Sequence, residues 1–206
     1  MSSSLIVVES PAKVKTIKKF LGTDYQVMAS VGHVKDLPKS TLGIDITKDF
    51  TPTYQIMEDK KKVLSEIKKA SEKSANIYLA PDPDREGEAI AWHIAEEVGL
   101  GKRPIYRVLF NDLTKNTVIS ALEHPTELDF NKYEAQQTRR ILDRRVGYQI
   151  SPILWEKVQR GLSAGRGQSV AVRISCDRET EIRNFSSEEY WNLTAVLSGA
   201  TPQTFE

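Results

Sequence analysis

Residues 78–94, YLAPDPDREGEAIAWHI, join a short apolar run to a longer apolar pattern through a turn that holds two prolines. A continuous apolar run of this length is typical of a buried strand, here residues 77–80. The apolar residues that follow recur at four-residue spacing from Ile90 to Val98, which predicts a helix over residues 86–98. The turn and the start of the helix carry alternating acids: Asp82, Asp84, Glu86 and Glu88.

The same alternation of strand and helix extends to both sides of this stretch. Buried strands are predicted at residues 5–8, 25–31, 77–80 and 105–110, and helices after Pro11, at residues 60–73 and at residues 86–98. Ser10 is placed as the N-cap of the first helix, with Pro11 at its first position. Residues 32–57 show no clear period and are predicted to form a long excursion. The alternation indicates an α/β fold, a mainly parallel sheet flanked by helices, and we assign residues 1–113 to it.

After about residue 113 the predicted elements are helical. Helices are predicted at residues 114–122, 132–147, 152–158 and 167–183, with a strand-like run at residues 190–197. We therefore expect a second, mainly helical domain, of which residues 114–206 form an incomplete part.

Composition excludes several classes of protein. The chain has 206 residues, 39% of them hydrophobic, and no apolar stretch approaches the roughly 20 residues of a membrane-spanning helix. No basic segment precedes the first apolar run, which argues against a signal peptide. The single cysteine, Cys176, excludes an intramolecular disulfide and a cysteine-rich zinc site. We expect a monomer in the reducing cytoplasm, with no membrane partner.

The basic side chains are concentrated in one segment. The whole chain has a net charge of +1, but residues 139–183 carry ten basic and five acidic side chains, and nine of the ten are arginines. The planar guanidinium group binds phosphate through two parallel hydrogen bonds, which lysine cannot do. A nucleic-acid contact surface is one interpretation of this segment. A solvated helix face with intrahelical ion pairs is the other, and the segment alone leaves both open.

Carboxylates follow two of the predicted strands. Glu9 comes directly after residues 5–8, and Asp82 comes just after residues 77–80. Because ligands of parallel sheets gather beyond the carboxyl ends of the strands, these acids are candidates for a Mg²⁺ site, together with Asp84. Crowding is expected to raise the pKa of one of the carboxyls. The alternative, acids that favour a helix N-terminus, explains the acids at the helix start but not Glu9.

Five segments together resemble the N-terminal part of bacterial type IA DNA topoisomerases, the topoisomerase I family. They are LIVVESPAKVKTIKKFLG (5–22), SVGHVKDLP (30–38), APDPDREGEAIAWHI (80–94), AQQTRRILDRRVGYQISPILW (135–155) and GLSAGRGQSVAVR (161–173). The first hundred-odd residues resemble the Toprim domain of that family, which primases and some nucleases share. The acidic motif alone would indicate only Toprim. The arginine-rich segments narrow the resemblance to type IA topoisomerases.

The resemblance implies a catalytic and metal-binding role for five residues. Glu9 is implied to bind metal and to transfer a proton at the scissile phosphodiester. Asp82, Asp84 and Glu86 match the acidic triad that holds Mg²⁺. Lys13 matches a lysine that stabilises the phosphate, and its place near a helix N-terminus independently favours anions.

The resemblance also implies DNA contacts. His33 is one, after a strand and beside Gly32. The others lie in the two later segments: Arg139, Arg140, Asp143, Tyr148, Trp155, Ser163, Ala164, Gly165, Arg166, Gly167, Gln168, Ser169 and Arg173. Arg140 and Arg144, four apart on one helix face, repel each other unless an anion lies nearby. Gly167 departs from the family, which usually has an apolar residue there, and it weakens the helix start by about 1 kcal/mol.

The family relaxes negatively supercoiled DNA without ATP, using Mg²⁺ and a tyrosine that cuts one strand and forms a 5′-phosphotyrosine. None of the tyrosines in this chain has the arginine and threonine that follow that nucleophile. We therefore expect a fragment that does not cleave DNA by itself, from an enzyme that acts on single-stranded segments of DNA at the nucleoid. The alternatives are topoisomerase III, reverse gyrase, a Toprim nuclease or primase, and a stand-alone single-stranded DNA-binding module.

Overall fold

The computed structural model describes residues 4–101, 103–197 and 203–204. The chain divides into two compact units, Met1–Ser163 and Ala164–Glu206. The first unit contains the sheet and the helices that surround it. Each unit is described by itself below.

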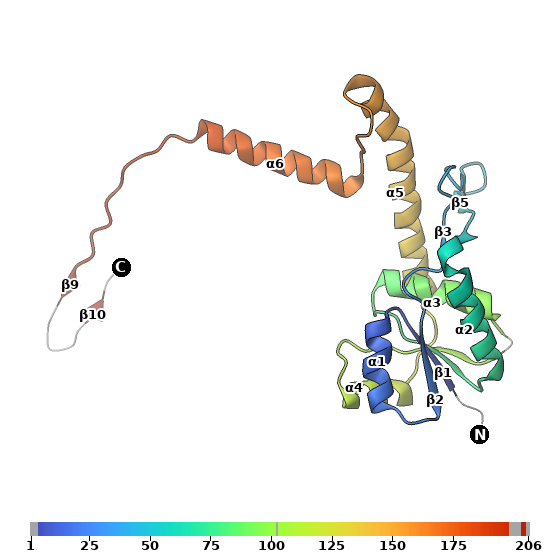
Figure 1. Cartoon of the computed structure of the whole chain (residues 1–206). Helices are drawn as coiled ribbons and strands as arrows, with labels where there is room; N and C mark the ends of the chain where they lie inside the picture. The colour runs from blue at the N-terminus through green and yellow to red at the C-terminus, as the bar shows by residue number, and fades with distance from the viewer. Residues whose placement is uncertain (1–3, 102, 198–202, 205–206) are drawn as a thin grey trace. The chain divides into compact units, whose positions relative to one another are not determined.

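A four-stranded parallel sheet forms the centre of the first unit (Figure 1). Its strands, in spatial order, are β2 (Tyr25–Ala29), β1 (Ser4–Val8), β7 (Ile77–Leu79) and β8 (Ile105–Arg107). Every neighbouring pair is parallel. The predicted α/β fold with a parallel sheet is therefore confirmed.

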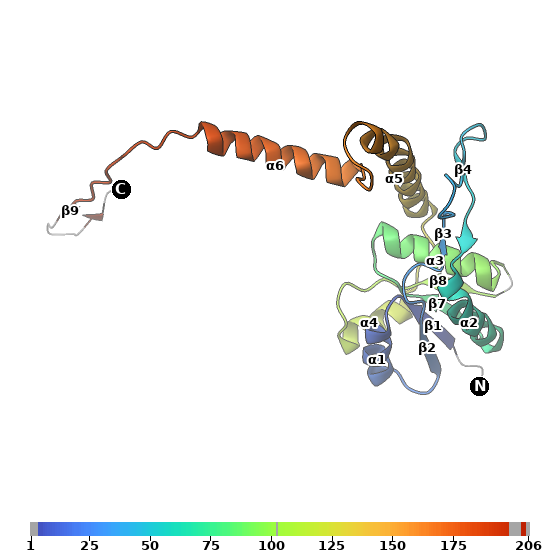
Figure 2. The same cartoon turned by 45° about the horizontal axis from the view of Figure 1, so that its top comes forward.

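Helices cover both faces of the sheet (Figures 1 and 2). Helices α1 (Pro11–Phe20) and α4 (Lys115–Glu123) lie on one face. Helices α2 (Lys61–Lys73) and α3 (Arg85–Val98) lie on the other. All four helices were predicted from the apolar periodicity of the sequence.

The core follows the alternation of side chains along β1. Leu5 and Val7 pack with residues of α2 and α3 that include Ile67 and Ile94. Ile6 and Val8 point to the opposite face, where Ile17 of α1 and Val118 of α4 meet them. All of these side chains are buried, and each burial stabilises the fold by about 1.5–3 kcal/mol. Strand β1 is therefore buried on both faces, as a continuous apolar run predicts.

Side-chain caps fix where three of these helices begin. The Ser10 hydroxyl accepts a hydrogen bond from the Lys13 amide at 3.4 Å, and Pro11 occupies the first position of α1 as predicted. Asp84 caps α3 by accepting from the Gly87 amide at 2.8 Å. Thr114 caps α4 through the amide of Thr117. The ends of the strands are thereby joined to helices through short, defined turns.

The excursion at residues 32–57 contains two short antiparallel ladders that the sequence did not predict. Strand β3 (Lys35–Asp36) pairs with β6 (Gln55–Ile56), and β4 (Ile44–Asp45) pairs with β5 (Thr51–Pro52). Strands of two residues carry too few side chains to show a period. A 3₁₀ turn, η1 (Glu58–Lys60), then leads into α2.

Helix α5 (Phe130–Lys157) leaves the sheet region as one continuous helix of 28 residues. The prediction of two helices, at 132–147 and 152–158, was wrong, because the helix runs through both Gly147 and Pro152. The fixed φ of proline is compatible with a helix, although its ring removes one backbone hydrogen bond and crowds the carbonyl group four residues earlier. Near its start, α5 packs on α3 through Tyr133, whose ring stacks on Trp92 with centroids 5.0 Å apart.

The second unit contains α6 (Arg166–Asn184) and a short ladder of β9 (Val196–Leu197) with β10 (Gln203–Thr204). The helix was predicted at residues 167–183. The strand predicted at residues 190–197 is present only at its last two residues, because in the described part of this unit only β10 offers a hydrogen-bonding partner. Within the described residues, no helix has the length and apolar content needed to cross a membrane.

Candidate metal and DNA-binding site

The candidate site starts at the edge of the sheet where β1 and β7 end, here called the carboxyl edge. The two strands are adjacent and parallel, with Val7 opposite Leu79. Glu9 follows β1 directly, and Asp82 lies in the loop of residues 80–84 between β7 and α3, here called the acidic loop. The Asp82 amide donates a hydrogen bond to Glu9 Oε2 at 2.9 Å. The fold therefore brings together two acids that are 73 residues apart in the sequence.

The ammonium group of Lys13 lies between these two carboxylates. Lys13 Nζ is 2.5 Å from Glu9 Oε1, and it also pairs with Asp82 Oδ1. The side chains of Lys13 and Glu9 are mostly buried, with 17% and 19% exposed, whereas that of Asp82 is 53% exposed. The Lys13 ammonium group thus bridges the two acids at the carboxyl edge, and Asp82 is the acid that is more exposed to solvent.

The Lys13 bridge shifts the pKa of Lys13 and of Asp82 in the direction that favours their charged forms. The hydrogen bond from Lys13 lowers the pKa of Asp82 below its usual value, despite an opposing effect of burial. Burial alone would lower the pKa of Lys13, but its hydrogen bonds to Asp82 and Glu9 raise it instead. At Asp82 the shift therefore has the opposite sign to the increase expected from crowded carboxyls, since that expectation left out the lysine.

The other two acids of the predicted metal set point elsewhere. Asp84 uses its carboxylate to cap α3. Glu86, in the first turn of the same helix, accepts a hydrogen bond from Gln136 Nε2 at 3.1 Å and lies 3.3 Å from His33 Nε2. Within residues 4–101, 103–197 and 203–204, no three acidic, histidine or cysteine side chains are arranged to hold a metal ion. The structure brings Glu9 and Asp82 together, while the carboxylates of Asp84 and Glu86 have other partners.

The donors at the carboxyl edge nevertheless fit a hard divalent cation. The Lys13 ammonium stands where a cation is favoured, between oxygens of Glu9 and Asp82. Mg²⁺ prefers carboxylate oxygens and keeps several waters, so two carboxylates, waters and a substrate phosphate are enough ligands. The metal role of all four acids remains a prediction.

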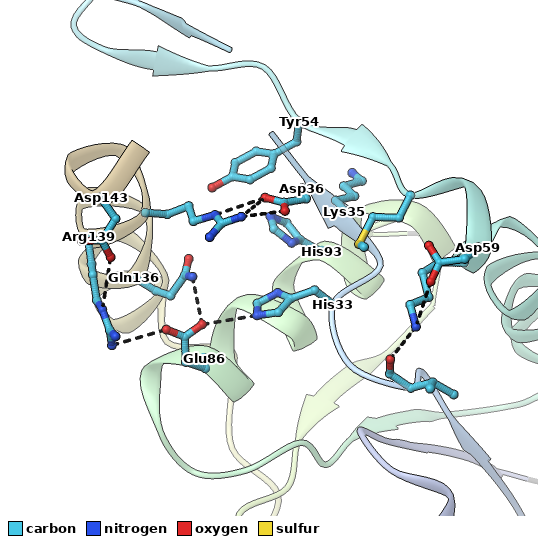
Figure 3. Close-up of a pocket in the computed structure, with 14 residues that line it drawn as sticks. His33, Lys35, Asp36, Tyr54, Asp59, Glu86, His93, Gln136, Arg139 and Asp143 are labelled. Atoms are coloured by element: carbon cyan, nitrogen blue, oxygen red, sulfur yellow. Dashed lines mark hydrogen bonds and ion pairs between the residues drawn. The ribbon is translucent and has the colours of Figure 1, made fainter. Parts of the chain in front are cut away.

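Glu86 is at the centre of a pocket of about 410 Å³ between α3, α5 and the excursion (Figure 3). Besides His33 and Gln136, Arg139 approaches Glu86, with 3.5 Å between NH1 and Oε1. Arg139 is also 3.7 Å from Asp143 one turn further along α5. His33 reaches the pocket because the chain turns sharply before it, with Val31 and Gly32 both at positive φ (59° and 85°). Five of the predicted site residues therefore line this pocket: His33, Glu86, Arg139, Arg140 and Asp143.

Arg140 binds the excursion in this structure. Its guanidinium group contacts both carboxylate oxygens of Asp36, with 2.6 Å from NH2 to each. Burial opposes the charge of Asp36, but the hydrogen bonds from Arg140 lower its pKa below the usual value. Arg144 donates to the carbonyl oxygen of Pro38 at 2.8 Å, and the Tyr148 hydroxyl donates to that of Lys39 at 2.6 Å. Asp36 thus supplies an anion near both arginines, so their spacing on one helix face does not by itself require nucleic acid.

The floor of the pocket holds buried polar atoms without partners. His93 is 2% exposed, and among the described residues neither of its ring nitrogens has a hydrogen-bond partner. The ring of Tyr54 lies 4.7 Å from it, and the hydroxyl of Tyr54 is also unpartnered. Burial lowers the pKa of His93 to about 4 and raises that of Tyr54 to about 12. Both side chains are therefore neutral at physiological pH.

The remaining predicted DNA contacts lie at the end of the first unit and in the second. Trp155 of α5 is half exposed and donates from Nε1 to the carbonyl oxygen of Leu162. In the second unit Gly165 is the N-cap of α6, and its carbonyl oxygen accepts from the Ser169 amide at 2.9 Å. Arg173 pairs with Asp177 one turn further on, at 2.9 Å. The other residues of this segment that were predicted to contact DNA flank these positions: Ser163, Ala164, Arg166, Gly167 and Gln168.

Sequence reasoning missed a buried pair below the acidic loop. Arg107 and Glu88 are each 1% exposed, and Arg107 Nε is 2.8 Å from Glu88 Oε2. The available signal was an arginine inside a run of apolar and aromatic residues that predicts a strand. Glu88 was noted only as an acid at a helix start.

Comparisons with known proteins show the family of the chain. The family model of the Toprim domain matches residues 4–113, more than half of the chain, and that of DNA topoisomerase matches residues 127–206. The solved structure of full-length topoisomerase I from Thermotoga maritima is 49% identical and superposes with a TM-score of 0.81. The match covers 88% of this chain and 31% of that protein, so the chain spans about a third of its length. The chain belongs to the bacterial type IA DNA topoisomerases.

Proposed function

We propose that this chain is the Mg²⁺- and DNA-contacting part of an enzyme that relaxes negatively supercoiled DNA without ATP. The break would be made in one strand and held as a 5′-phosphotyrosine. Such an enzyme acts on single-stranded segments of DNA at the nucleoid of the cytoplasm, and we expect it to be a monomer. Family membership supports the reaction class, and the carboxyl edge supports the metal.

The observation that carries this proposal is the Lys13 bridge between Glu9 and Asp82. It places two carboxylates and one cation at the N-terminal end of α1, where the helix dipole favours an anion. A phosphodiester at this position would meet positive charge from the lysine and from the helix. The position of the Lys13 bridge is therefore explained better by a reaction at phosphate than by a purely structural role for the ion pair.

Each residue of the carboxyl edge has a role in this proposal. Glu9 and Asp82 would hold Mg²⁺, which supplies positive charge to the oxygens of the reacting phosphate when it is bound. Lys13 would contact a phosphate oxygen. Glu9 is the group that would exchange a proton with the 3′-oxygen released from the cut strand. Asp82, the more exposed acid, would face the DNA.

The pocket beside the carboxyl edge supplies the DNA contacts. The side chain of Arg139 is 47% exposed, and its ion pairs with Glu86 and Asp143 are long, at 3.5 and 3.7 Å, so it would be available to a phosphate. Arg140 is held by Asp36, and a phosphate would have to compete with that carboxylate. His33 lies at the same pocket, between Glu86 and the strained turn before it. A single strand that crosses this pocket would therefore meet Arg139 and His33 first.

The nucleophile of the reaction is not among the tyrosines of this chain. None of its seven tyrosines is followed by the arginine and threonine that mark the nucleophile in the family. We therefore expect no DNA cleavage from the 206-residue chain alone, with or without Mg²⁺.

The experiment that tests the proposal is a plasmid relaxation assay on the full-length gene product. We expect relaxation of negatively supercoiled plasmid with Mg²⁺, no relaxation after chelation, and no effect of ATP. Asp82→Asn should reduce the rate by at least tenfold, whereas Glu66→Gln, on the exposed face of α2, should not change it. Failure to relax the plasmid with Mg²⁺ would contradict the proposal, and accumulation of nicked plasmid alone would indicate a Toprim nuclease.

A further inference from the structure

The guanidinium group of Arg107 holds the acidic loop through hydrogen bonds to main-chain carbonyl groups. NH1 donates to the carbonyl oxygens of Leu79 and Pro81 at 3.1 and 2.9 Å, and NH2 donates to that of Asp82 at 2.5 Å. The side chain comes from the end of β8, two strands away from β1. One buried cation therefore binds three carbonyl groups of the main chain within residues 79–82.

Close packing against Gly87 of α3 also restricts movement of the acidic loop. The carbonyl group of Asp82 lies directly against Gly87 of α3, where a Cβ atom would be only 2.0 Å from the Asp82 oxygen. The Asp82 amide is held at the same time by Glu9. The main chain of Asp82 is thus fixed on three sides, by Arg107, Gly87 and Glu9.

Glu88 connects this arrangement to the start of α5. Its Oε2 accepts from Arg107 Nε at 2.8 Å, and its Oε1 accepts from the amide of Asp129 at 2.8 Å. Asp129 is the N-cap of α5 and accepts from the Lys132 amide at 3.1 Å. The backbone of Arg107 also exchanges two hydrogen bonds of 2.8 Å with Thr126, just before α5. The same buried pair therefore contacts the acidic loop and the helix that carries the predicted DNA contacts.

A contribution to stability alone would not require this pair. Buried ion pairs can often be replaced by apolar residues of similar volume without loss of stability, because burial of the charges offsets much of their attraction. What apolar residues cannot supply is a directional set of hydrogen bonds to chosen carbonyl and amide groups. The pair is therefore better explained by the positions that it fixes.

We infer that Arg107 and Glu88 are positioning residues that hold the acidic loop and the N-terminus of α5 in one fixed relation. The carboxylate of Asp82 and the arginines of α5 are then placed together, so that a single phosphodiester backbone meets both. The inference rests on the proposed function for its consequence, but the positioning itself is a property of this chain.

Hydrogen exchange of two amides tests the positioning without metal or DNA. The Asp82 amide reports on the acidic loop and the Asp129 amide on the start of α5, and both are measured by NMR in the 206-residue chain. In the double variant Arg107→Met, Glu88→Met both amides should exchange at least tenfold faster, while core amides such as that of Val7 change less than twofold. Arg107→Lys keeps the buried charge and should show the same effect at Asp82 if the double variant does not fold.

A matched control removes a similar arginine from the opposite end of the sheet. Arg103 donates to the carbonyl oxygens of Ser71 and Ser74 at 2.6 and 2.8 Å, far from the acidic loop in the fold. Arg103→Met should leave both reporter amides unchanged. Exchange of the Asp82 and Asp129 amides within twofold of the wild type in all Arg107 and Glu88 variants would overturn the inference. An effect at Asp82 with none at Asp129 would overturn the link to α5.

A Mg²⁺ titration of the same variants separates this inference from the proposed function. We expect Mg²⁺ affinity to fall at least tenfold in Arg107→Lys and in the double variant, and to stay unchanged in Arg103→Met. A chain that binds no Mg²⁺ at all would contradict the proposed metal site, while the exchange measurements would still decide the positioning role. Unchanged Mg²⁺ affinity in a double variant with faster exchange would show that the loop position does not matter for the metal and would overturn the inferred consequence.

Discussion

Lys13 Nζ lies 2.5 Å from Glu9 Oε1 and also pairs with Asp82, so this one side chain determines how much negative charge the carboxyl edge presents. Two carboxylates this close would repel each other without a cation between them. The lysine therefore serves the fold in the free chain. A divalent cation that binds the same oxygens has to share them with the lysine or displace it.

Removal of the Lys13 charge should strengthen Mg²⁺ binding by the chain. Lys13→Met leaves Glu9 and Asp82 facing each other without a cation, and because Asp82 is half exposed we expect a gain of roughly two- to fivefold in Mg²⁺ affinity. Isothermal titration calorimetry measures it. Lys15→Met removes an exposed lysine from the same helix and is the control. Equal or weaker Mg²⁺ binding by Lys13→Met would show that the lysine does not stand in for a cation.

His93 makes the stability of the first unit depend on pH. Burial lowers its pKa to about 4 from 6.5, and the nearby Lys35 and His33 act in the same direction against Asp36 and Glu97. Because the pKa of His93 is lower in the folded chain than in the unfolded chain, the contribution of His93 to stability is complete above pH 6.5. This contribution is lost as the pH falls toward 4. Between pH 7.5 and pH 5 we expect a loss of about 2 kcal/mol in the free energy of unfolding from this group.

Urea titrations of variants at the two pH values measure this contribution. His93→Phe keeps an aromatic ring between Tyr54 and Tyr133 and should remove about that much of the pH dependence. His124→Gln, at an exposed histidine, should leave it unchanged. The same pH dependence in His93→Phe and the wild type would assign the loss to other groups.

At the scale of elements, the sequence predicted what depends on periodicity. The four parallel strands and the helices on their faces follow from apolar runs and four-residue spacing, and Ser10 and Pro11 marked a helix start correctly. The two short ladders of the excursion could not be predicted, because their pairing depends on contacts across the fold. Continuity of α5 through Pro152 was missed because proline usually ends a helix.

The candidate site was predictable only where it depends on the sheet. That Glu9 and Asp82 meet follows from the parallel order of β1 and β7. Asp84 and Glu86 have other partners, because Asp84 is the N-cap of α3 and Glu86 lies in its first turn, where it meets Gln136 and His33. The pairs of Arg107 with Glu88 and of Arg140 with Asp36 join segments that local sequence patterns cannot relate.

Gly87 is the residue of α3 on which the acidic loop depends most directly. In Gly87→Ala the new Cβ would lie 2.0 Å from the Asp82 oxygen and 2.8 Å from its carbonyl carbon and amide nitrogen, so the loop or the helix must move. We expect a net loss of about 2 kcal/mol of stability, because overpacking outweighs the higher helix propensity of alanine. Urea unfolding measures it. Gly22→Ala, with no heavy atom within 4 Å, is the control, and equal stability of the two variants would contradict the packing argument.

At the scale of the whole molecule, the basic charge is concentrated in one segment of the sequence. The net charge is only +1, yet residues 139–183 carry ten basic side chains, nine of them arginines, and five acidic side chains. In the structure several of these arginines already have carboxylate partners, Asp36 for Arg140 and Asp177 for Arg173. Binding of single-stranded DNA should therefore be weak and should involve exchange of partners.

The salt dependence of DNA binding tests whether Arg139 and Arg140 contact phosphate groups. About four phosphate contacts would give a slope near −3 for the logarithm of affinity against that of salt, at roughly 0.7 per phosphate for single strands. Arg139→Ala with Arg140→Ala should flatten this slope by about one or two units, as fluorescence anisotropy with a labelled oligonucleotide would show. Arg178→Ala with Arg183→Ala removes two arginines paired within α6 and is the matched control. If the double variant Arg139→Ala, Arg140→Ala kept the slope of the wild type, these two arginines would belong to a solvated helix face that does not contact DNA.

The central claim is that Glu9 and Asp82 form a divalent cation site at the carboxyl edge, and Mn²⁺ tests it most directly. Mn²⁺ takes the same oxygen ligands as Mg²⁺ and broadens the NMR signals of nearby amides. In the 206-residue chain we expect broadening centred on residues 9–13 and on the acidic loop, reversed by excess Mg²⁺ and absent in Asp82→Asn. Broadening centred elsewhere, or unchanged in Asp82→Asn, would contradict the account.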